Sequence, residues 1–289
     1  MITRFAPSPT GYLHLGHVVN CIYVWGLARL RGGRVLLRIE DHDRIRSRPE
    51  FERAILEDLQ WLGFAADAGR HPVRRQSDNA GAYERAVARL QKSHTVYACH
   101  CSRKDIGSDR YPGTCRDRQL HVGDPLPSGA GVRVQLDDRP ERFDDLALGE
   151  VVQTPAEQCG DLLLRDRDGN WTYQFAVTVD DISEGVDFVI RGLDLVSSTA
   201  RQIKLARMLG RDSPPLFFHH PLIVKADGEK LSKANRDTGV SELRAAGLDP
   251  AAVIGQAAVA VGLLDRFRPV DAAAVSELVA VADRQRGRT

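Results

Sequence analysis

Residues 4–17 decide the fold, and they read Arg4-Phe5-Ala6-Pro7-Ser8-Pro9-Thr10-Gly11-Tyr12-Leu13-His14-Leu15-Gly16-His17. A short apolar strand, Ile2 to Ala6, passes through a loop rich in Pro and Gly into an apolar helix that we expect to extend to Leu30. His14 and His17 therefore stand where a strand gives way to a helix. Because the first backbone N–H groups of a helix have no partner inside it, this junction is typical of an anion site.

A second stretch far along the chain reads Lys230-Leu231-Ser232-Lys233-Ala234. It follows an apolar strand that we expect at Pro221 to Val224 and the turn Lys225 to Gly228. Taken singly, both stretches are weak signals, since His-x-Gly-His arises by chance and Lys-x-Ser-Lys is ordinarily a solvated loop. Their joint presence carries more weight than either motif.

Read together, the two stretches resemble the signatures of the class I aminoacyl-tRNA synthetases. The first stretch and the segment Arg38-Ile39-Glu40-Asp41 are similar to the glutamyl branch of that family, and so is the segment from Val179 to Leu195. The resemblance covers about residues 1–235. It implies an α/β fold, in which a Rossmann-like doubly wound parallel sheet carries an inserted zinc-bearing α+β domain and a short C-terminal helical segment.

The bulk properties fit such a protein. The chain has 289 residues, more than the ~100–200 of a typical domain, and a formal net charge of +1. Contact with a nucleic acid must therefore come from a local basic face. No apolar run approaches the ~20 residues of a membrane span, and the N-terminus lacks a signal peptide. We expect a cytoplasmic monomer with no membrane contact.

The order of elements suggests the domain boundaries. A strand at Val35 to Ile39 follows the first helix and completes a right-handed parallel unit, so ligands are expected beyond its end, where Glu40 lies. From about Val96 to Gly160 the alternation of strands and helices breaks down. We expect residues 1–95 to form the first half of the nucleotide-binding domain, 96–160 the insertion with the zinc site, 161–235 the second half and 236–289 the C-terminal helical segment.

Local patterns predict further elements. A helix is expected from Pro49, with an apolar stripe of Phe51, Ile55, Leu59 and Leu62. Another is expected around the apolar stripe of Tyr83, Ala86, Val87 and Leu90. A hairpin is expected where Asp161 to Arg165 and Trp171 to Val179 flank the turn at 166–170. Beyond it we expect a strand at Val186 to Ile190, a helix at Ser197 to Leu209, helix N-caps at Asp249 and Asp271, and a C-terminal apolar stripe of Val275, Leu278 and Val279.

The resemblance implies that a glutamate carboxylate attacks the α-phosphate of ATP. That nucleophile is already ionised at neutral pH, so catalysis depends on positioning and on neutralising phosphate charge, with Mg²⁺ bridging phosphates. The resemblance assigns ATP binding to His14, Gly16, His17 and Lys233, and catalysis to His14, His17, Lys230 and Lys233. The family motif usually ends in Ser where this chain has Ala234, which leaves one hydroxyl contact in question.

A glutamate ligand needs a cation for each carboxylate and an acceptor for its ammonium group. The resemblance assigns L-glutamate binding to Arg4, Phe5, Ala6, Pro7, Ser8, Glu40, Tyr173 and Arg191. The two arginines can form bidentate pairs with carboxylates, Glu40 can take the ammonium group, and Tyr173 can pack against the aliphatic part. Taken alone, an arginine at a strand end is usually structural or solvated.

Cysteine usage favours a metal site. The cysteines are Cys21, Cys99, Cys101, Cys115 and Cys159, an odd number with three clustered, which favours metal binding in a reducing compartment over a disulfide framework. Three thiolates and one N or O donor can close a tetrahedral structural Zn²⁺ site. The resemblance points to Tyr111 as the fourth ligand, and His100 is the conventional alternative. The alternative to a metal site is that the three thiols bind no metal.

The length of the C-terminal segment bears on which molecule accepts the glutamate. The segment after Lys233 is too short for the stem-contact and anticodon-binding domains of a full-length glutamyl-tRNA synthetase. In a short chain with Cys-x-Cys and Lys-Leu-Ser-Lys-x-Asn235, the resemblance implies activation of glutamate without tRNA and transfer to the queuosine base of tRNA(Asp). Two alternatives stay open: a truncated enzyme that charges tRNA(Glu), and a catalytically idle RNA-binding paralogue.

Overall fold

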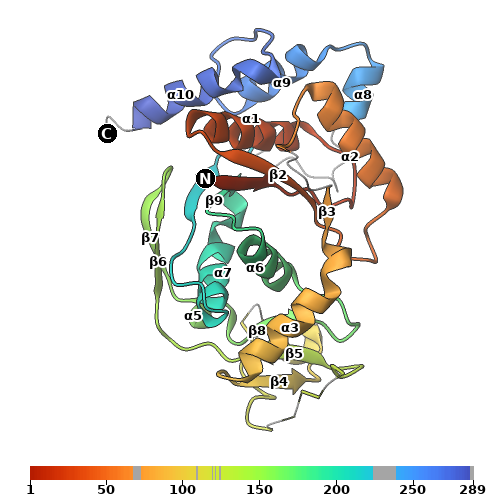
Figure 1. Ribbon diagram of the computed structural model, residues 1–289, viewed down its shortest axis with the longest axis vertical. Helices are drawn as coiled ribbons and strands as arrows, with labels where there is room; N and C mark the ends of the chain where they lie inside the picture. Colours follow the sequence, from red (N-terminus) through yellow and green to blue (C-terminus); the bar gives the residue numbers. More distant parts are fainter. Residues whose placement is uncertain are drawn as a thin grey trace.

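The computed structural model of the chain describes residues 1–67, 73–108, 110–118, 120, 122–123, 125–223 and 239–286, with side chains described up to residue 280. Helices lie on both sides of a mainly parallel sheet, and a smaller antiparallel sheet lies at the far end of the molecule (Figure 1). The predicted α/β class, a Rossmann-like sheet interrupted by an inserted lobe, is confirmed. No helix in the described ranges is long and apolar enough to cross a membrane.

The central sheet has two hydrogen-bonded parts that meet edge to edge. One part has the order β1 (Ile2–Phe5), β2 (Arg34–Ile39) and β3 (Arg74–Arg75), all parallel. The other has the order β7 (Gly149–Gln153), β6 (Glu141–Asp145), β10 (Leu216–His220) and β9 (Phe188–Gly192), in which the β6–β7 pair is antiparallel. The parts meet where the N–H of Asp187 donates to the carbonyl of Ile2 over 3.1 Å.

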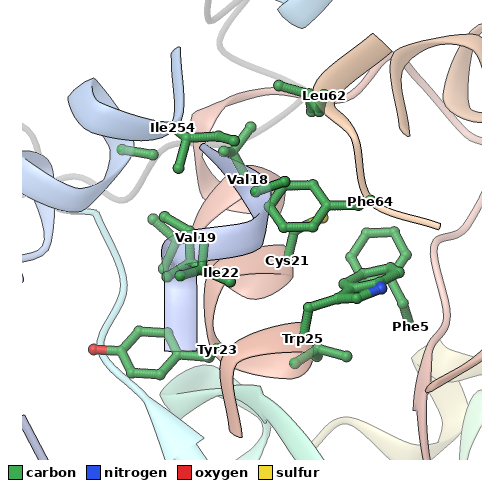
Figure 2. Packing of buried hydrophobic residues seen from close by; sticks show 14 of the residues in the cluster. Phe5, Val18, Val19, Cys21, Ile22, Tyr23, Trp25, Leu62, Phe64 and Ile254 are labelled. Atoms are coloured by element: carbon green, nitrogen blue, oxygen red, sulfur yellow. The ribbon is translucent and has the colours of Figure 1, made fainter. Parts of the chain in front are cut away.

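Helix α1 (Leu15–Leu30) lies at the centre of the main core. Between Val18 and Ala28 every residue except Asn20 is buried, as expected of a helix that is apolar all round. Strand β1 packs on one side, and α9 (Pro250–Ala260) and α10 (Val275–Arg286) cover the other. Figure 2 shows Ile254 of α9 against Val18 and Val19. The predicted C-terminal apolar stripe, Val275, Leu278 and Val279, is buried in this contact.

The remaining helices follow their apolar patterns. In α2 (Pro49–Leu62) the stripe residues Ile55, Leu59 and Leu62 are buried and Phe51 is half-buried. The 3-10 helix η1 (Gln76–Asn79) precedes α3 (Ala80–Gln91), whose predicted stripe is buried except for the half-buried Ala86. Asp249 caps α9 by accepting from the N–H of Ala252 over 2.7 Å, as predicted. The other elements on the large sheet and the C-terminal segment are α6 (Tyr173–Ser183), η2 (Leu193–Leu195), α7 (Val196–Met208), α8 (Val240–Ala245) and η4 (Ala272–Ala274).

The small lobe is built on an antiparallel sheet with the order β4 (Val96–Cys99), β5 (Gly131–Val134) and β8 (Leu162–Arg165). Helices α4 (Arg103–Ile106) and α5 (Pro155–Cys159) flank it. A second core joins this sheet to α3 and α6, with Val132, Leu164 and Phe175 fully buried. The lobe is therefore anchored to the large sheet by packed helices.

Three sequence expectations differ from the structure. Strands β6 and β7 lie in the segment 96–160 but belong to the large sheet, where β6 pairs with β10 and β7 pairs with β6. By contrast β8, which follows that segment, pairs with β5 of the small lobe. After the turn at 166–170 the strand expected at Trp171 to Val179 is limited to a bridge between Arg165 and Trp171, and α6 begins at Tyr173. The strand expected at Pro221 to Val224 is wrong for 221–223, because β10 ends at His220.

Candidate active site

A cleft of about 350 Å³ opens at the N-terminus of α1, beyond the carboxyl ends of β9 and β10. We call it the histidine cleft. Its walls are His14, Gly16, His17, Val19, Asn20, Gly192, Asp194, Leu195, His220, Pro221, Leu222 and Ile223. The predicted ATP-binding residues His14, Gly16 and His17 thus line one cavity, with the N-terminus of a helix directed at it.

The two imidazoles cap α1. The backbone N–H of Gly16 donates to Nδ1 of His14 over 3.1 Å, and the backbone N–H of His14 donates to Nδ1 of His17, also over 3.1 Å. Since both Nδ1 atoms accept, each neutral ring carries its proton on Nε2. Histidine therefore does here what Ser or Asp does in most helix caps, and it also supplies an N–H donor.

A second cavity of about 390 Å³ lies beside the ends of β1, β2 and β9. We call it the arginine pocket. Its walls are Arg4, Ala6, Ser8, Thr10, Asn20, Glu40, His42, Asp43, Arg46, Tyr173, Ile190, Arg191, Gly192 and Leu195. Arg4, Ala6 and Ser8 alternate because an extended chain turns every second side chain to the same face. Phe5 and Pro7, also predicted for glutamate, are not among these wall residues, and the Phe5 ring packs on Trp25 with centroids 5.3 Å apart.

Buried ion pairs hold Arg4 and Glu40 in the wall. The Nε of Arg4 donates to both carboxylate oxygens of Asp181 over 3.1 and 3.2 Å. Arg38, fully buried, donates to Asp181 over 2.8 Å and to Glu40 over 3.1 Å. Burial raises the pKa of Asp181, but the two arginines outweigh it and hold that pKa below its usual value. The carboxylate thus stays ionised and fixes the orientation of Arg4.

Arg191 is held by a chain of buried groups. Its Nε donates to Nε2 of His219 over 3.0 Å, and its Nη atoms donate to Gln202 and Thr199 over 2.7 and 2.8 Å. The Nδ1 of His219 lies 2.5 Å from the carboxylate of Asp145. Because Nε2 must accept from Arg191, Nδ1 carries the proton and His219 is neutral. Burial lowers the pKa of His219, which agrees with a neutral ring.

The two cavities adjoin, and this juxtaposition is the main feature of the site. Asn20, Gly192 and Leu195 line both. The histidine cleft offers a helix N-terminus and the two imidazoles of His14 and His17. The arginine pocket offers guanidinium groups, carboxylates and the ring of Tyr173, and among them Arg4, Arg191 and Glu40 are the predicted glutamate-binding residues. Burial raises the pKa of the Tyr173 hydroxyl, which therefore keeps its proton as a donor. The arrangement can hold a polyphosphate next to a small ligand that has two carboxylates and an ammonium group.

The predicted lysines, Lys230 and Lys233, lie outside the described residues, as do Ser232 and Ala234. The residues that flank this part of the chain are described, and both lie at the histidine cleft. Ile223 is one of its wall residues, and Gly239 forms a β-bridge with His14.

The predicted zinc ligands are gathered in the small lobe. The sulfur atoms of Cys99, Cys101 and Cys115 lie within 4.8 Å of one another, and the Tyr111 hydroxyl lies 3.4 Å from the Cys99 sulfur. His100 is exposed and is not among the potential metal ligands grouped in the described part of the chain. Thiolates bound to one tetrahedral Zn²⁺ at about 2.3 Å would have this spacing, so the residues fit the metal.

Sequence reasoning missed several residues that shape the site. Asp145 and His219 orient Arg191, and Asn20 lies in the wall shared by both cavities. Asn20 gave a usable signal, because it is the one polar residue in the apolar run from Val18 to Leu27. Asp145 gave none, since the pairing of β6 with β10 joins residues that are distant in the chain.

Comparison with known proteins agrees with this geometry. Residues 1–260 match the family model described as the catalytic domain of class I tRNA synthetases (E and Q). A glutamyl-Q tRNA(Asp) synthetase from Symbiobacterium thermophilum is 40% identical and covers 98% of this chain and 92% of its own length. Another, from Rhodobacter capsulatus, is 40% identical over 87% of this chain and 97% of its own length.

Among solved structures, a glutamate tRNA ligase from Elizabethkingia meningosepticum in complex with its amino acid superimposes with a TM-score of 0.77 at 27% identity. The match covers 96% of this chain and 64% of that one, so the chain spans about two thirds of the ligase. The family match extends over most of the sequence and includes both cavities described above. The chain belongs to the class I tRNA synthetases of the glutamyl and glutaminyl family.

Proposed function

We propose that this chain activates L-glutamate with ATP to glutamyl-adenylate without a tRNA, and then transfers glutamate to the queuosine base of tRNA(Asp). The observation that supports the proposal is the shared wall of the histidine cleft and the arginine pocket, because the cavity proposed for the triphosphate adjoins the cavity proposed for the acidic amino acid. The names of the relatives support the choice of acceptor.

In the first step, a carboxylate oxygen of glutamate bonds to the α-phosphorus of ATP, and the bond from that phosphorus to the bridging oxygen of pyrophosphate breaks. No proton needs to move, because the attacking carboxylate is ionised at neutral pH. His14 and His17 donate from Nε2 to the phosphates, and the N-terminus of α1 adds its partial positive charge. Mg²⁺, bound with ATP, would neutralise further phosphate charge.

Glutamate would be held by the fixed arginines. Arg4 and Arg191 face the two carboxylates, Glu40 accepts from the ammonium group, and Tyr173 packs on the methylene chain. Both arginines are locked by buried partners before the ligand arrives, so little side-chain entropy remains to be lost on binding. Ser8 and Ala6 complete the wall as predicted.

We propose that Lys233 stabilises the transition state and that Lys230 and Ser232 support it. Two things support this role: the motif in the sequence, and the position of the flanking residues Ile223 and Gly239 at the histidine cleft. The matched test is glutamate-dependent ATP–pyrophosphate exchange in Lys233→Ala beside Lys92→Ala, in which Lys92 is the exposed residue that directly follows α3. We expect exchange to be lost in the first variant and kept in the second.

In the second step, a hydroxyl oxygen of the queuosine ring attacks the carbonyl carbon of the adenylate. An ester C–O bond forms, the bond from the carbonyl carbon to the AMP oxygen breaks, and the hydroxyl proton leaves with AMP or to solvent. The transfer changes no oxidation state, so it needs neither an oxidant nor a reductant. The anhydride bond made in the first step drives this transfer.

We propose Zn²⁺ as a structural ion held by Cys99, Cys101, Cys115 and Tyr111. The Tyr111 oxygen accepts from the N–H of Cys115 over 2.8 Å and contacts the Cys99 sulfur, so it closes the group of sulfurs as a fourth donor. The ion would fix the loop between β4 and α4 to the loop that carries Cys115 and would take no part in adenylation.

The test of the proposed function is ATP–pyrophosphate exchange with glutamate and no RNA, followed by transfer of labelled glutamate to two preparations of tRNA(Asp). We expect exchange without RNA, transfer to tRNA(Asp) that carries queuosine, and none to tRNA(Asp) that lacks it. Charging of tRNA(Glu) instead would show a truncated glutamyl-tRNA synthetase. Absence of exchange from the folded protein would show a catalytically idle paralogue.

A further inference from the structure

A third cavity adjoins the arginine pocket, and the adenylation step proposed above does not use it. It has a volume of about 270 Å³ and is lined by His42, Arg44, Gln76, Ser77, Ala80, Tyr83, Glu84, Arg165, Asp168, Gly169, Asn170 and Trp171. We call it the tryptophan pocket. His42 lines both this pocket and the arginine pocket, so the two cavities meet at that side chain.

The pocket offers aromatic and guanidinium surfaces together. The Trp171 ring packs on Tyr83 and Phe175, with centroid separations of 5.5 and 5.3 Å, and the guanidinium carbon of Arg165 lies 5.7 Å from the Trp171 centroid. Sequence-specific recognition of RNA relies on unpaired bases that stack on such aromatic rings and guanidinium planes. The packing below Trp171 makes this a preformed surface.

The polar groups of the pocket fall into two sets. Gln76 is committed to the fold, since it donates to Asp180 over 2.8 Å and its carbonyl lies 2.7 Å from Nδ1 of His42. Asn170 is likewise bonded to Asp166. By contrast, Glu84 and Asp168 are exposed, and no hydrogen bond or ion pair within the described residues engages their carboxylates. Two open carboxylates in an aromatic pocket suit a planar ligand whose edge carries N–H donors.

We propose that the tryptophan pocket receives the base of the acceptor nucleotide, a guanine-type base whose N–H edge meets Glu84 and Asp168. The inference rests on the proposed function and adds the place of the acceptor. A queuosine base keeps the N–H donors of guanine and carries its hydroxyls on a flexible arm. With the base stacked at Trp171, the arm extends past His42 toward the activated carboxyl group in the arginine pocket.

The first test compares matched double variants. Asp168→Asn with Glu84→Gln removes both pocket carboxylates, and Asp138→Asn with Glu277→Gln makes the same charge change at exposed positions elsewhere. We expect the KM for queuosine-containing tRNA(Asp) to rise about tenfold or more in the pocket variant and to stay within about twofold in the control. ATP–pyrophosphate exchange, measured without RNA, separates this effect from a loss of adenylation.

A binding measurement covers the case in which the pocket variant folds poorly. The chain has three tryptophans, and of these Trp25 is buried in the main core. Addition of an anticodon stem–loop of tRNA(Asp) should quench fluorescence in the wild type, and Trp171→Phe should remove most of the quenching while keeping an aromatic ring. Equal KM values in both double variants, or quenching that persists in Trp171→Phe, would overturn the pocket and leave the proposed function standing. A wild type that exchanges pyrophosphate but transfers no glutamate would overturn both.

Discussion

Gly16 has only a hydrogen where another residue would carry a side chain, and the His14 ring uses that space. A Cβ atom at position 16 would lie 2.9 Å from Cε1 of His14, closer than Cβ atoms come to other atoms in real proteins, and 3.0 Å from Nδ1 of the same ring. Gly16→Ala should therefore displace the imidazole and break its cap on α1. We expect the KM for ATP in the exchange assay to rise about 5- to 10-fold, the equivalent of a lost cap, with little change for glutamate.

Gly123→Ala is the control for this prediction, because a Cβ there meets its nearest atom at an ordinary 3.6 Å. If Gly16→Ala keeps the wild-type KM for ATP, the capping imidazole does not contact the nucleotide.

Asp145 determines which nitrogen of His219 carries a proton. An asparagine at 145 can donate to Nδ1 of His219, and the proton of the ring would then lie on Nε2. That N–H would face the Nε–H of Arg191, so two donors would meet and their hydrogen bond would be lost. We expect Asp145→Asn to raise the KM for glutamate about 10- to 100-fold, with a smaller effect on the KM for ATP. Asp144→Asn, the exposed neighbour on β6, is the control, and equal values in the two variants would contradict the role of Asp145.

At this scale the sequence predicted the residues that belong to motifs. Arg4, Ser8, Glu40, Tyr173 and Arg191 were assigned through the resemblance, and all line one pocket. It could not predict the groups that hold them, because Asp181, His219 and Asp145 reach the arginines only through strand pairing and helix packing.

Among the elements, α2 contains a buried acid that lowers stability at neutral pH. Asp58 is buried on this helix, its Oδ2 has no hydrogen-bond partner in the described structure, and burial raises its pKa to about 6. The folded state thus holds this proton more tightly than the unfolded chain, so the stability from this group is complete below pH 3.8 and is lost as pH rises through about 6.

We expect Asp58→Asn to abolish this loss. Between pH 4.5 and 8 the free energy of unfolding of the wild type should fall relative to that of the variant, by up to about 2 kcal/mol. Urea unfolding at the two pH values measures the difference, with Asp138→Asn as the exposed control. Parallel pH dependence in wild type and Asp58→Asn would show that the carboxylate is solvated.

Periodicity predicted most helices and failed where two signals compete. The apolar stripes of α2 and α3 and the cap at Asp249 were correct because they are local. The segment from Trp171 to Val179 is rich in aromatic and β-branched residues and follows a turn, which favours a strand. In the structure it forms α6, because a helix here can pack on α7 and α3 and bury Phe175.

For the whole molecule, the two lobes should respond differently to metal removal. Without an ion, burial and neighbouring thiols raise the pKa of Cys101 to about 11, so a bound Zn²⁺ must displace its proton. We expect one zinc per chain by metal analysis, and Cys99→Ser should lose it and lower the melting temperature of the small lobe. Adenylation should persist, because both of its cavities lie on the large sheet. Cys159→Ser, outside the sulfur cluster, should keep the metal; if it and Cys99→Ser bind zinc equally, the site is not this one.

The pairing of β6 with β10 has a consequence for anyone who would re-engineer this scaffold. A designer reading the chain as a nucleotide-binding fold with a removable cassette at 96–160 would excise or transplant that cassette as a unit. Such a graft would remove β6, the strand that pairs with β10. It would also remove Asp145, so that Nδ1 of His219 would lose its hydrogen-bond partner. Exchanges of the small lobe between relatives should therefore rejoin the chain before Glu141, so that the hairpin of β6 and β7 stays with the large sheet.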